Sequence, residues 1–122
     1  MTPPLRRRRI GFAGCLLVQL VVLYAPRAPA TGGTPGIDKL VHVLIFAAVG
    51  VTAVRAGLPL YPVLGLLLAH AVVSEVLQAT LLPGRSGDGW DVLADLAGVL
   101  LAWLLVARGT AVPADEPASG RR

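Results

Sequence analysis

Residues 37–82 read IDKLVHVLIFAAVGVTAVRAGLPLYPVLGLLLAHAVVSEVLQATLL. Two apolar runs, about 37–56 and 60–82, are joined by a Gly-Leu-Pro sequence that is typical of a tight turn. Each run is long enough to cross a hydrocarbon core of roughly 30 Å at about 1.5 Å per helical residue. This stretch therefore predicts two transmembrane helices that run in opposite directions.

Two more apolar runs flank this pair, at about 10–25 and 90–107. The first is short, rising only about 24 Å as a helix, but snorkelling arginines and local thinning of the bilayer make up such a difference. We therefore predict an all-α integral membrane four-helix bundle. The chain then divides into a basic N-terminus (1–9), a transmembrane domain (10–107, with spans at about 10–25, 37–56, 60–82 and 90–107) and a disordered tail (108–122).

The composition supports a membrane protein of one domain. Of the 122 residues, 55% are hydrophobic and 15% charged, and the mean hydropathy is +0.72. A soluble domain of this size could not bury so much apolar surface, so the lipid bilayer is the predicted partner. The net charge of +4 sits at segment ends and chain termini, which argues against nucleic acid as a partner. The oligomeric state stays open.

The first apolar run allows two other interpretations. A cleaved signal peptide would explain the basic start and the small residues Ala28-Pro29-Ala30, but its removal would leave three spans. A lipoprotein site at Cys15 would need a longer apolar stretch after Arg9. We therefore expect a retained first span. The single cysteine excludes a disulfide within the chain.

The distribution of basic residues predicts the orientation. With the N-terminus inside, eight arginines are cytoplasmic and three basic residues lie outside, and the opposite orientation reverses this bias. Short segments rich in Lys and Arg stay in the cytoplasm, so we predict that both termini are cytoplasmic. The inner set is Arg6, Arg7, Arg8, Arg9, Arg55, Arg108, Arg121 and Arg122, and the outer set is Arg27, Lys39 and Arg85.

This topology brings polar residues from three spans to a similar level near the outer face. Asp91 and Asp95 are one helical turn apart, and Gly98 continues their stripe. Asp38 and His42 share the same spacing on the second span. Ionisable groups inside a membrane usually face a bundle interior, and a glycine lets a second helix approach closely.

These residue types suit chemistry on a bound molecule. The predicted catalytic residues are His42 and Glu75, as proton donor and acceptor, with Asp91 as their partner. The predicted ligand-binding residues are Lys39, Gln78, Arg85, Asp88 and Asp95. Arginine offers a bidentate fork and lysine a point charge to a phosphate, such as that of a lipid-linked envelope precursor.

Two other readings of the same residues remain. A polar clasp would use them only to hydrogen-bond the helices together. A divalent cation would suit the imidazole and carboxylates of His42, Glu75, Asp91 and Asp95, but the sequence has no HExxH motif and no paired Cys and His ligands. We therefore predict no metal and no other cofactor.

The sequence resembles the VanZ-like membrane proteins. The matching pieces are Asp38-Lys39-x-x-His42-x-x-x-Phe46, Glu75-x-x-Gln78, and Arg85-x-x-Asp88-x-x-Asp91-x-x-x-Asp95-x-x-Gly98. They span about residues 37–107, and the family often has Asn at the position of Asp95. The resemblance implies a bacterial cytoplasmic membrane protein linked to the cell envelope. The family's namesake is associated with low-level teicoplanin resistance, and the family carries no settled biochemical activity.

From the cluster and the resemblance together, we expect binding or modification of an amphiphilic envelope molecule near the outer leaflet. Whether the protein is an enzyme stays open. One alternative is a small proton or ion transporter, although only His70 and Ser74 approach the middle of the predicted bundle. Another is a membrane module that packs against a partner without chemistry.

Overall fold

The computed structural model describes residues 2–26, 36–85 and 87–110, and within them the secondary structure is entirely helical. Three helices are long and apolar enough to cross a membrane, namely α2, α3 and α4. The fourth, α1, carries the arginine run within its length. The helices are α1 (Pro3–Tyr24), α2 (Ile37–Arg55), α3 (Leu60–Thr80) and α4 (Gly89–Thr110). The all-α prediction is confirmed.

Two helices extend further than the apolar runs. α1 begins at Pro3, seven residues before the predicted span, because proline suits the first turn of a helix and arginine has a high helix propensity. α4 continues to Thr110, so the first residues of the predicted disordered tail are helical. The rest of that tail, from 111 to 122, and most of the first loop, from 27 to 35, lie outside the described residues.

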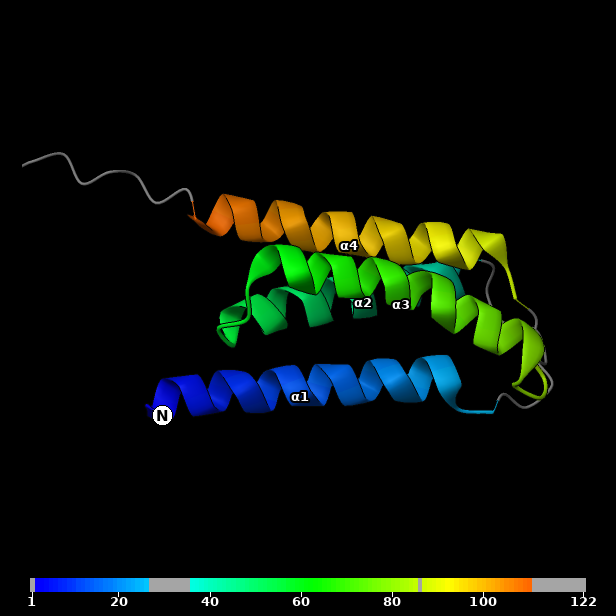
Figure 1. Cartoon of the computed structure of the whole chain (residues 1–122), viewed down its shortest axis with the longest axis horizontal. Helices are drawn as coiled ribbons and strands as arrows, with labels where there is room; N and C mark the ends of the chain where they lie inside the picture. The colour runs from blue at the N-terminus through cyan, green and yellow to red at the C-terminus, as the bar shows by residue number, and fades with distance from the viewer. Residues whose placement is uncertain (1, 27–35, 86, 111–122) are drawn as a thin grey trace, which may run out of the picture.

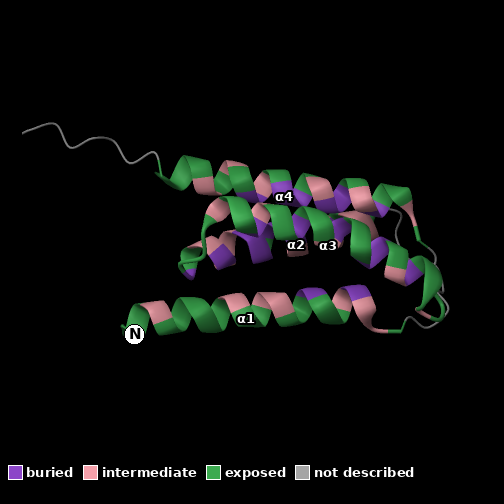
Figure 2. Cartoon of the chain, viewed as in Figure 1, coloured by how far each residue is buried: buried purple, intermediate pink, exposed green. Residues whose placement is uncertain are grey.

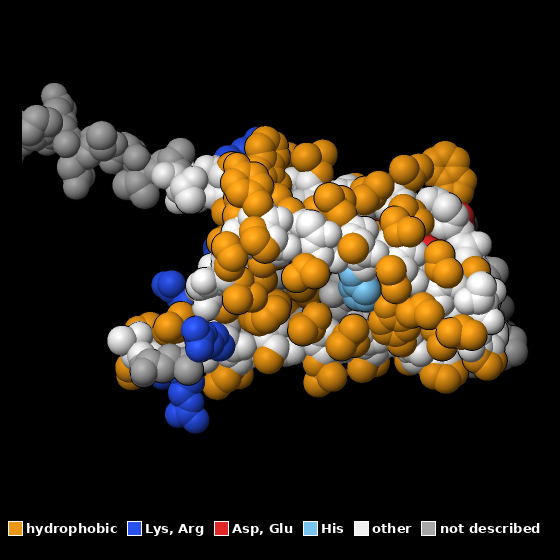
Figure 3. Space-filling model, viewed as in Figure 1, with side chains coloured by type: hydrophobic (Ala, Val, Ile, Leu, Met, Phe, Trp, Pro, Cys, Tyr) orange, Lys and Arg blue, Asp and Glu red, His pale blue; other side chains and the backbone are white. Residues whose placement is uncertain are grey.

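The four helices alternate in direction along the chain (Figure 1). One end of the bundle holds the start of α1, the end of α4 and the α2–α3 turn. We call this the basic end, because Lys and Arg side chains gather there in Figure 3. The opposite end holds the end of α1, the start of α2, the end of α3 and the start of α4, and we call it the acidic end for the carboxylates described below.

The predicted turn between α2 and α3 is confirmed. Gly57 has a φ of +95°, a left-handed conformation that glycine adopts without steric cost. The Leu58 N–H donates to the Ala53 carbonyl and the Gly57 N–H to the Val54 carbonyl, which is a Schellman-type end to α2. α3 begins directly after Pro59, so this short turn joins two helices that run in opposite directions.

Close packing of α2 against α4 depends on glycine. A Cβ atom added at Gly98 would lie 2.5 Å from the Val43 carbonyl oxygen and 2.8 Å from the Phe46 Cβ. A Cβ added at Gly50 would lie 2.6 Å from the Ala102 Cβ. The backbones therefore approach more closely than side chains would permit, as small residues allow in membrane bundles. The small-residue face predicted for the last span is confirmed.

The outside of the bundle is apolar. Many large hydrophobic side chains are exposed along the helices, including Leu66 at 72% and Val76 at 56%. Figure 2 shows exposed and buried positions alternating along α2, α3 and α4, while the buried positions of α1 lie near its end. Figure 3 shows hydrophobic side chains covering the body of the molecule between its two ends. Such a surface suits lipid as the surrounding solvent.

Candidate functional site

The acidic end gathers the buried polar side chains that the sequence predicted to converge. They come from three helices, and each is at most 6% exposed. The predicted juxtaposition follows from the antiparallel arrangement, because the start of α2, the end of α3 and the start of α4 meet at one end (Figure 1). The buried members are His42, Glu75, Gln78, Asp91 and Asp95.

His42 and Asp95 form the most deeply buried pair of the site. The His42 Nδ1 lies 2.7 Å from the Asp95 Oδ1, a hydrogen-bond distance, and the two side chains are 1% and 0% exposed. The other ring nitrogen, Nε2, lies 4.0 Å from the Asp91 Oδ2. The imidazole therefore stands between two carboxylates of α4, which face α2 one helical turn apart.

Lys39 contacts the buried Asp91 and the two more exposed carboxylates of the acidic end, Asp38 and Asp88. Its Nζ donates to Asp88 Oδ2 at 2.8 Å and to Asp91 Oδ1, and it lies 3.8 Å from Asp38 Oδ2. The hydrogen bond from Lys39 lowers the pKa of Asp88 below its ordinary value. Lys39 therefore links α2 to the α3–α4 loop and to α4.

Asp88 organises the start of α4. Its Oδ1 accepts a hydrogen bond of 2.9 Å from the Trp90 N–H, and its carbonyl accepts the Asp91 N–H at 2.9 Å. A side-chain bond of this kind caps the first turn of a helix. The Asp88 N–H in turn donates to Glu75 Oε2 at 2.9 Å. One loop residue thus connects α3, α4 and the Lys39 ammonium.

Two carboxylate oxygens of the site have no hydrogen-bond partner among the described residues. They are Glu75 Oε1 and Asp95 Oδ2, and both are buried. Buried polar atoms are normally satisfied, so each unsatisfied oxygen calls for an explanation. Two sets of side chains also bring one ligand-type atom each to within 4.8 Å of one another, namely Asp38, His42 and Asp91, and His42, Glu75 and Asp95.

Gln78 and Arg85 reach the end of α1. The Gln78 Nε2 donates to the Leu23 carbonyl at 3.0 Å. Arg85 donates to the Val22 carbonyl at 2.6 Å and, through two nitrogens, to the Ala25 carbonyl at 3.1 and 2.8 Å. The last carbonyls of a helix lack partners within it and carry partial negative charge, so an arginine fork suits them. These two predicted ligand-binding residues therefore fasten α1 to the bundle.

Sequence reasoning missed the environment of two polar side chains of α1, the buried Gln19 and the half-buried Tyr24. Gln19 is 0% exposed, and neither its amide oxygen nor its amide nitrogen has a partner among the described residues. Tyr24 donates or accepts a 2.9 Å hydrogen bond with His70 Nε2 across to α3. Gln19 could have been recognised from the sequence, because it is a single amide side chain within an apolar run. His70, which the sequence placed near the middle of the bundle, has Tyr24 as its partner.

The charges of the acidic end do not balance. Five carboxylates gather there, and the described basic side chains among them are those of Lys39 and Arg85, the latter held against the α1 carbonyls. His42 adds a positive charge only when protonated. The carboxylates are those of Asp38, Glu75, Asp88, Asp91 and Asp95. The site therefore attracts cations, protons and hydrogen-bond donors rather than anions.

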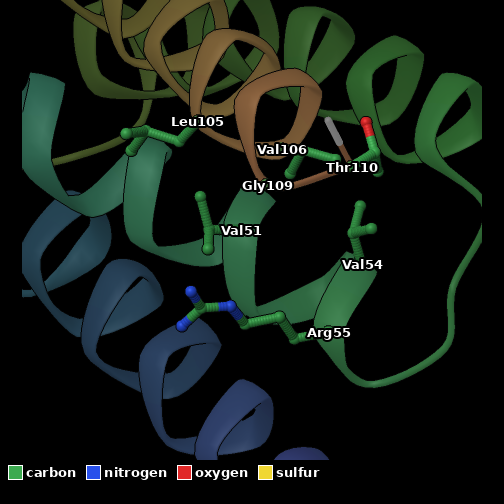
Figure 4. Close-up of a pocket in the computed structure, with 7 residues that line it drawn as sticks. All are labelled: Val51, Val54, Arg55, Leu105, Val106, Gly109 and Thr110. Carbon is green, nitrogen blue, oxygen red and sulfur yellow. The ribbon is translucent and has the colours of Figure 1, made fainter. Parts of the chain in front are cut away.

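A pocket of about 400 Å³ lies at the other end of the bundle, between α2 and α4. Figure 4 shows its walls, with the side chain of Arg55 extending along the α2 side. It lies at the end of α4 opposite to Asp91, so it is separate from the candidate site. Its lining residues are Val51, Val54, Arg55, Leu105, Val106, Gly109 and Thr110.

Comparison with known proteins found no match to this chain among family models, curated proteins or solved structures.

Proposed function

We propose that this chain binds the polar headgroup of an amphiphilic cell-envelope molecule at its acidic end and exchanges a proton with it. The single observation that carries the proposal is the concentration of buried ionisable groups at one end of an otherwise apolar bundle. Such groups are costly in a membrane and are associated with function. A headgroup at the same depth would meet them while its acyl chains lie along the exposed leucines and valines of the helices.

The arrangement of charges favours a headgroup with hydrogen-bond donors, such as sugar hydroxyls or an amine. Lys39 contacts three carboxylates, and Arg85 contacts backbone carbonyls, so neither offers an unengaged charge to a phosphate. Asp38 and Asp88, whose side chains are 39% and 40% exposed, form the accessible edge of the site. Binding of a phosphate would require Lys39 to leave its carboxylates.

The proposed proton exchange uses the buried groups behind that edge. In the proposal, His42 passes a proton between the ligand and Asp95, with which it is hydrogen-bonded, while Asp91 keeps the imidazole oriented. Glu75 serves as the second acceptor through its unpartnered oxygen. The VanZ-like resemblance supports a bacterial cytoplasmic membrane, and the distribution of basic residues supports an orientation with the acidic end towards the outer leaflet.

The proposal is tested by reconstituting the protein with lipid extracts enriched in lipid-linked envelope precursors. Native mass spectrometry should detect a bound amphiphile on the wild type, and chromatography of the lipids should detect any conversion. We expect His42→Gln and Glu75→Gln to reduce binding or conversion at least tenfold. The matched control is His70→Gln, which removes a half-buried histidine outside the site. Binding at the wild-type level by His42→Gln and Glu75→Gln, or an equal loss of binding in all three variants, would refute the proposal.

A small proton transporter is the second candidate, and one observation favours it. The Tyr24–His70 hydrogen bond and the buried Gln19 carry polar groups further along α1 and α3 than the acidic end itself. Proteoliposomes with a pH gradient would distinguish the two functions. Proton flux that is lost in both His42→Gln and His70→Gln would favour transport, since the binding proposal requires His42 alone.

A further inference from the structure

Three of the buried side chains at the acidic end form a set suited to a metal ion. His42, Glu75 and Asp95 come from α2, α3 and α4, and one ligand-type atom of each lies within 4.8 Å of the others. All three are at most 6% exposed. Bonds of about 2.0 to 2.2 Å from zinc to nitrogen or oxygen place neighbouring ligand atoms about 3 Å apart. The remaining separation is one that side-chain rotation can close.

The unsatisfied atoms of the site point to the same place. Glu75 Oε1 and Asp95 Oδ2 are buried without partners in the described parts of the chain, although each residue's other oxygen is hydrogen-bonded. The bonds already made hold each carboxylate in place and leave one oxygen ready to coordinate. Protein metal ligands are commonly oriented by such outer contacts.

The charge balance separates this set from the other acidic residues. Lys39 already compensates Asp88 and Asp91, and it lies near Asp38. Among the described residues, the contacts of Glu75 and Asp95 include no lysine or arginine. Two ionised carboxylates and a neutral imidazole carry a charge of −2, which one divalent cation neutralises. Without it, two negative charges remain in a low-dielectric interior at a high free-energy cost.

We propose that His42, Glu75 and Asp95 bind one divalent transition-metal ion, with Zn²⁺ and Mn²⁺ as the ions that fit best. The mixed set of one imidazole and two carboxylates suits these ions, whereas Mg²⁺ and Ca²⁺ prefer oxygen ligands alone. The sequence shows no local metal motif because each ligand lies on a different helix. The metal would use the same three side chains as the proposed proton exchange, but its binding does not require the amphiphile.

The test uses the full-length protein in lipid nanodiscs, stripped with a chelator and then titrated with Zn²⁺ or Mn²⁺ alone. We expect one ion per chain by elemental analysis. Glu75→Gln and Asp95→Asn should weaken binding at least tenfold, because each removes a charged ligand and keeps the side-chain shape. The matched control is His70→Gln, which removes an imidazole that is hydrogen-bonded to Tyr24 and lies outside the proposed ligand set, and it should bind like the wild type.

A spectroscopic measurement on the wild type makes the test independent of how the variants fold. Mn²⁺ bound at this site should show nitrogen hyperfine coupling from the His42 imidazole in pulsed electron paramagnetic resonance. Absence of binding, a purely oxygen environment, or equal weakening in His70→Gln would overturn the proposal. If the protein binds metal but no amphiphile, the metal site is supported and only the proposed function is refuted.

Discussion

The hydrogen bond between His42 and Asp95 crosses from α2 to α4 where both side chains are almost completely buried. Replacing His42 by alanine would leave the buried Asp95 carboxylate without a hydrogen-bond partner among the described residues. Loss of one member of a buried pair costs about 3 to 5 kcal/mol, more than loss of both when the site can repack.

We therefore expect His42→Ala to lower the free energy of unfolding in detergent by about 3 kcal/mol or more. The double variant His42→Ala, Asp95→Ala should recover part of that loss, because the uncompensated charge is removed. Thermal or denaturant unfolding of the wild type, both single variants and the double variant gives the coupling energy. Strictly additive losses would show that the two side chains do not interact.

Asp88 gives the site a predictable response to acid. Its hydrogen bond with Lys39 keeps its folded-state pKa below the ordinary value of 3.8, so the unfolded chain takes up a proton at higher pH than the folded chain. The stabilisation from ionised Asp88 is therefore complete above the ordinary pKa and disappears as the pH falls through the lowered one.

The variant Asp88→Asn should lose stability less steeply than the wild type on acidification, while asparagine preserves the cap on α4. This expectation is checked by measuring unfolding temperatures at a series of pH values, down to the lowest pH at which the detergent remains soluble. Parallel curves for the two proteins would contradict it.

At the scale of the helices, Gly98 controls the contact that positions the site. It lies three residues after Asp95, and an added Cβ would collide with the Val43 carbonyl oxygen. A displacement of α4 from α2 would separate the atoms of His42 and Asp95, whose hydrogen bond is 2.7 Å. Packing in the interface and geometry in the site therefore depend on the same glycine.

Gly98→Ala should destabilise the protein by about 1 to 3 kcal/mol through overpacking. Its control is Gly65→Ala, where an added Cβ meets nothing within 4 Å, and which should be neutral or slightly stabilising because alanine favours a helix. Melting temperatures of the two variants under one condition decide the matter. Similar effects at both positions would mean that the α2–α4 contact tolerates the extra methyl group.

The helical elements could be predicted from the length of the apolar runs, and the convergence at the acidic end from the alternating direction of the helices. The spacing of Asp91, Asp95 and Gly98 already defined one face of α4. The hydrogen-bond partners of Gln78, Arg85 and Glu75 could not be predicted from the sequence, because all three side chains bond to backbone groups. A carbonyl or an N–H has no residue-specific signature, so only the fold reveals which one lies within reach.

At the scale of the whole molecule, charge is divided between the two ends. Arginines of α1, α2 and α4 gather at the basic end, and the carboxylates gather at the other (Figure 3). Positive charge next to spans favours the cytoplasmic side, so we predict the basic end inside. A reporter fused after the last residue should be active in the cytoplasm.

The orientation should weaken when the arginine run of α1 is removed. Replacing Arg6–Arg9 by glutamine reduces the predicted inner count from eight to four, against three outside. The reporter should then divide between the two sides, whereas replacing Arg121 and Arg122 leaves six against three and should have a smaller effect. An unchanged distribution in the fourfold variant would contradict a role for this run in orientation.

The attachment of α1 through its carbonyl groups has an evolutionary consequence. Arg85 and Gln78 bind main-chain oxygens of residues 22, 23 and 25, which every amino acid supplies. Side chains in the last turn of α1 can therefore diverge while docking is retained, provided that the helix still ends at the same depth. The length of this helix, rather than its composition, is what selection would have to preserve at that junction.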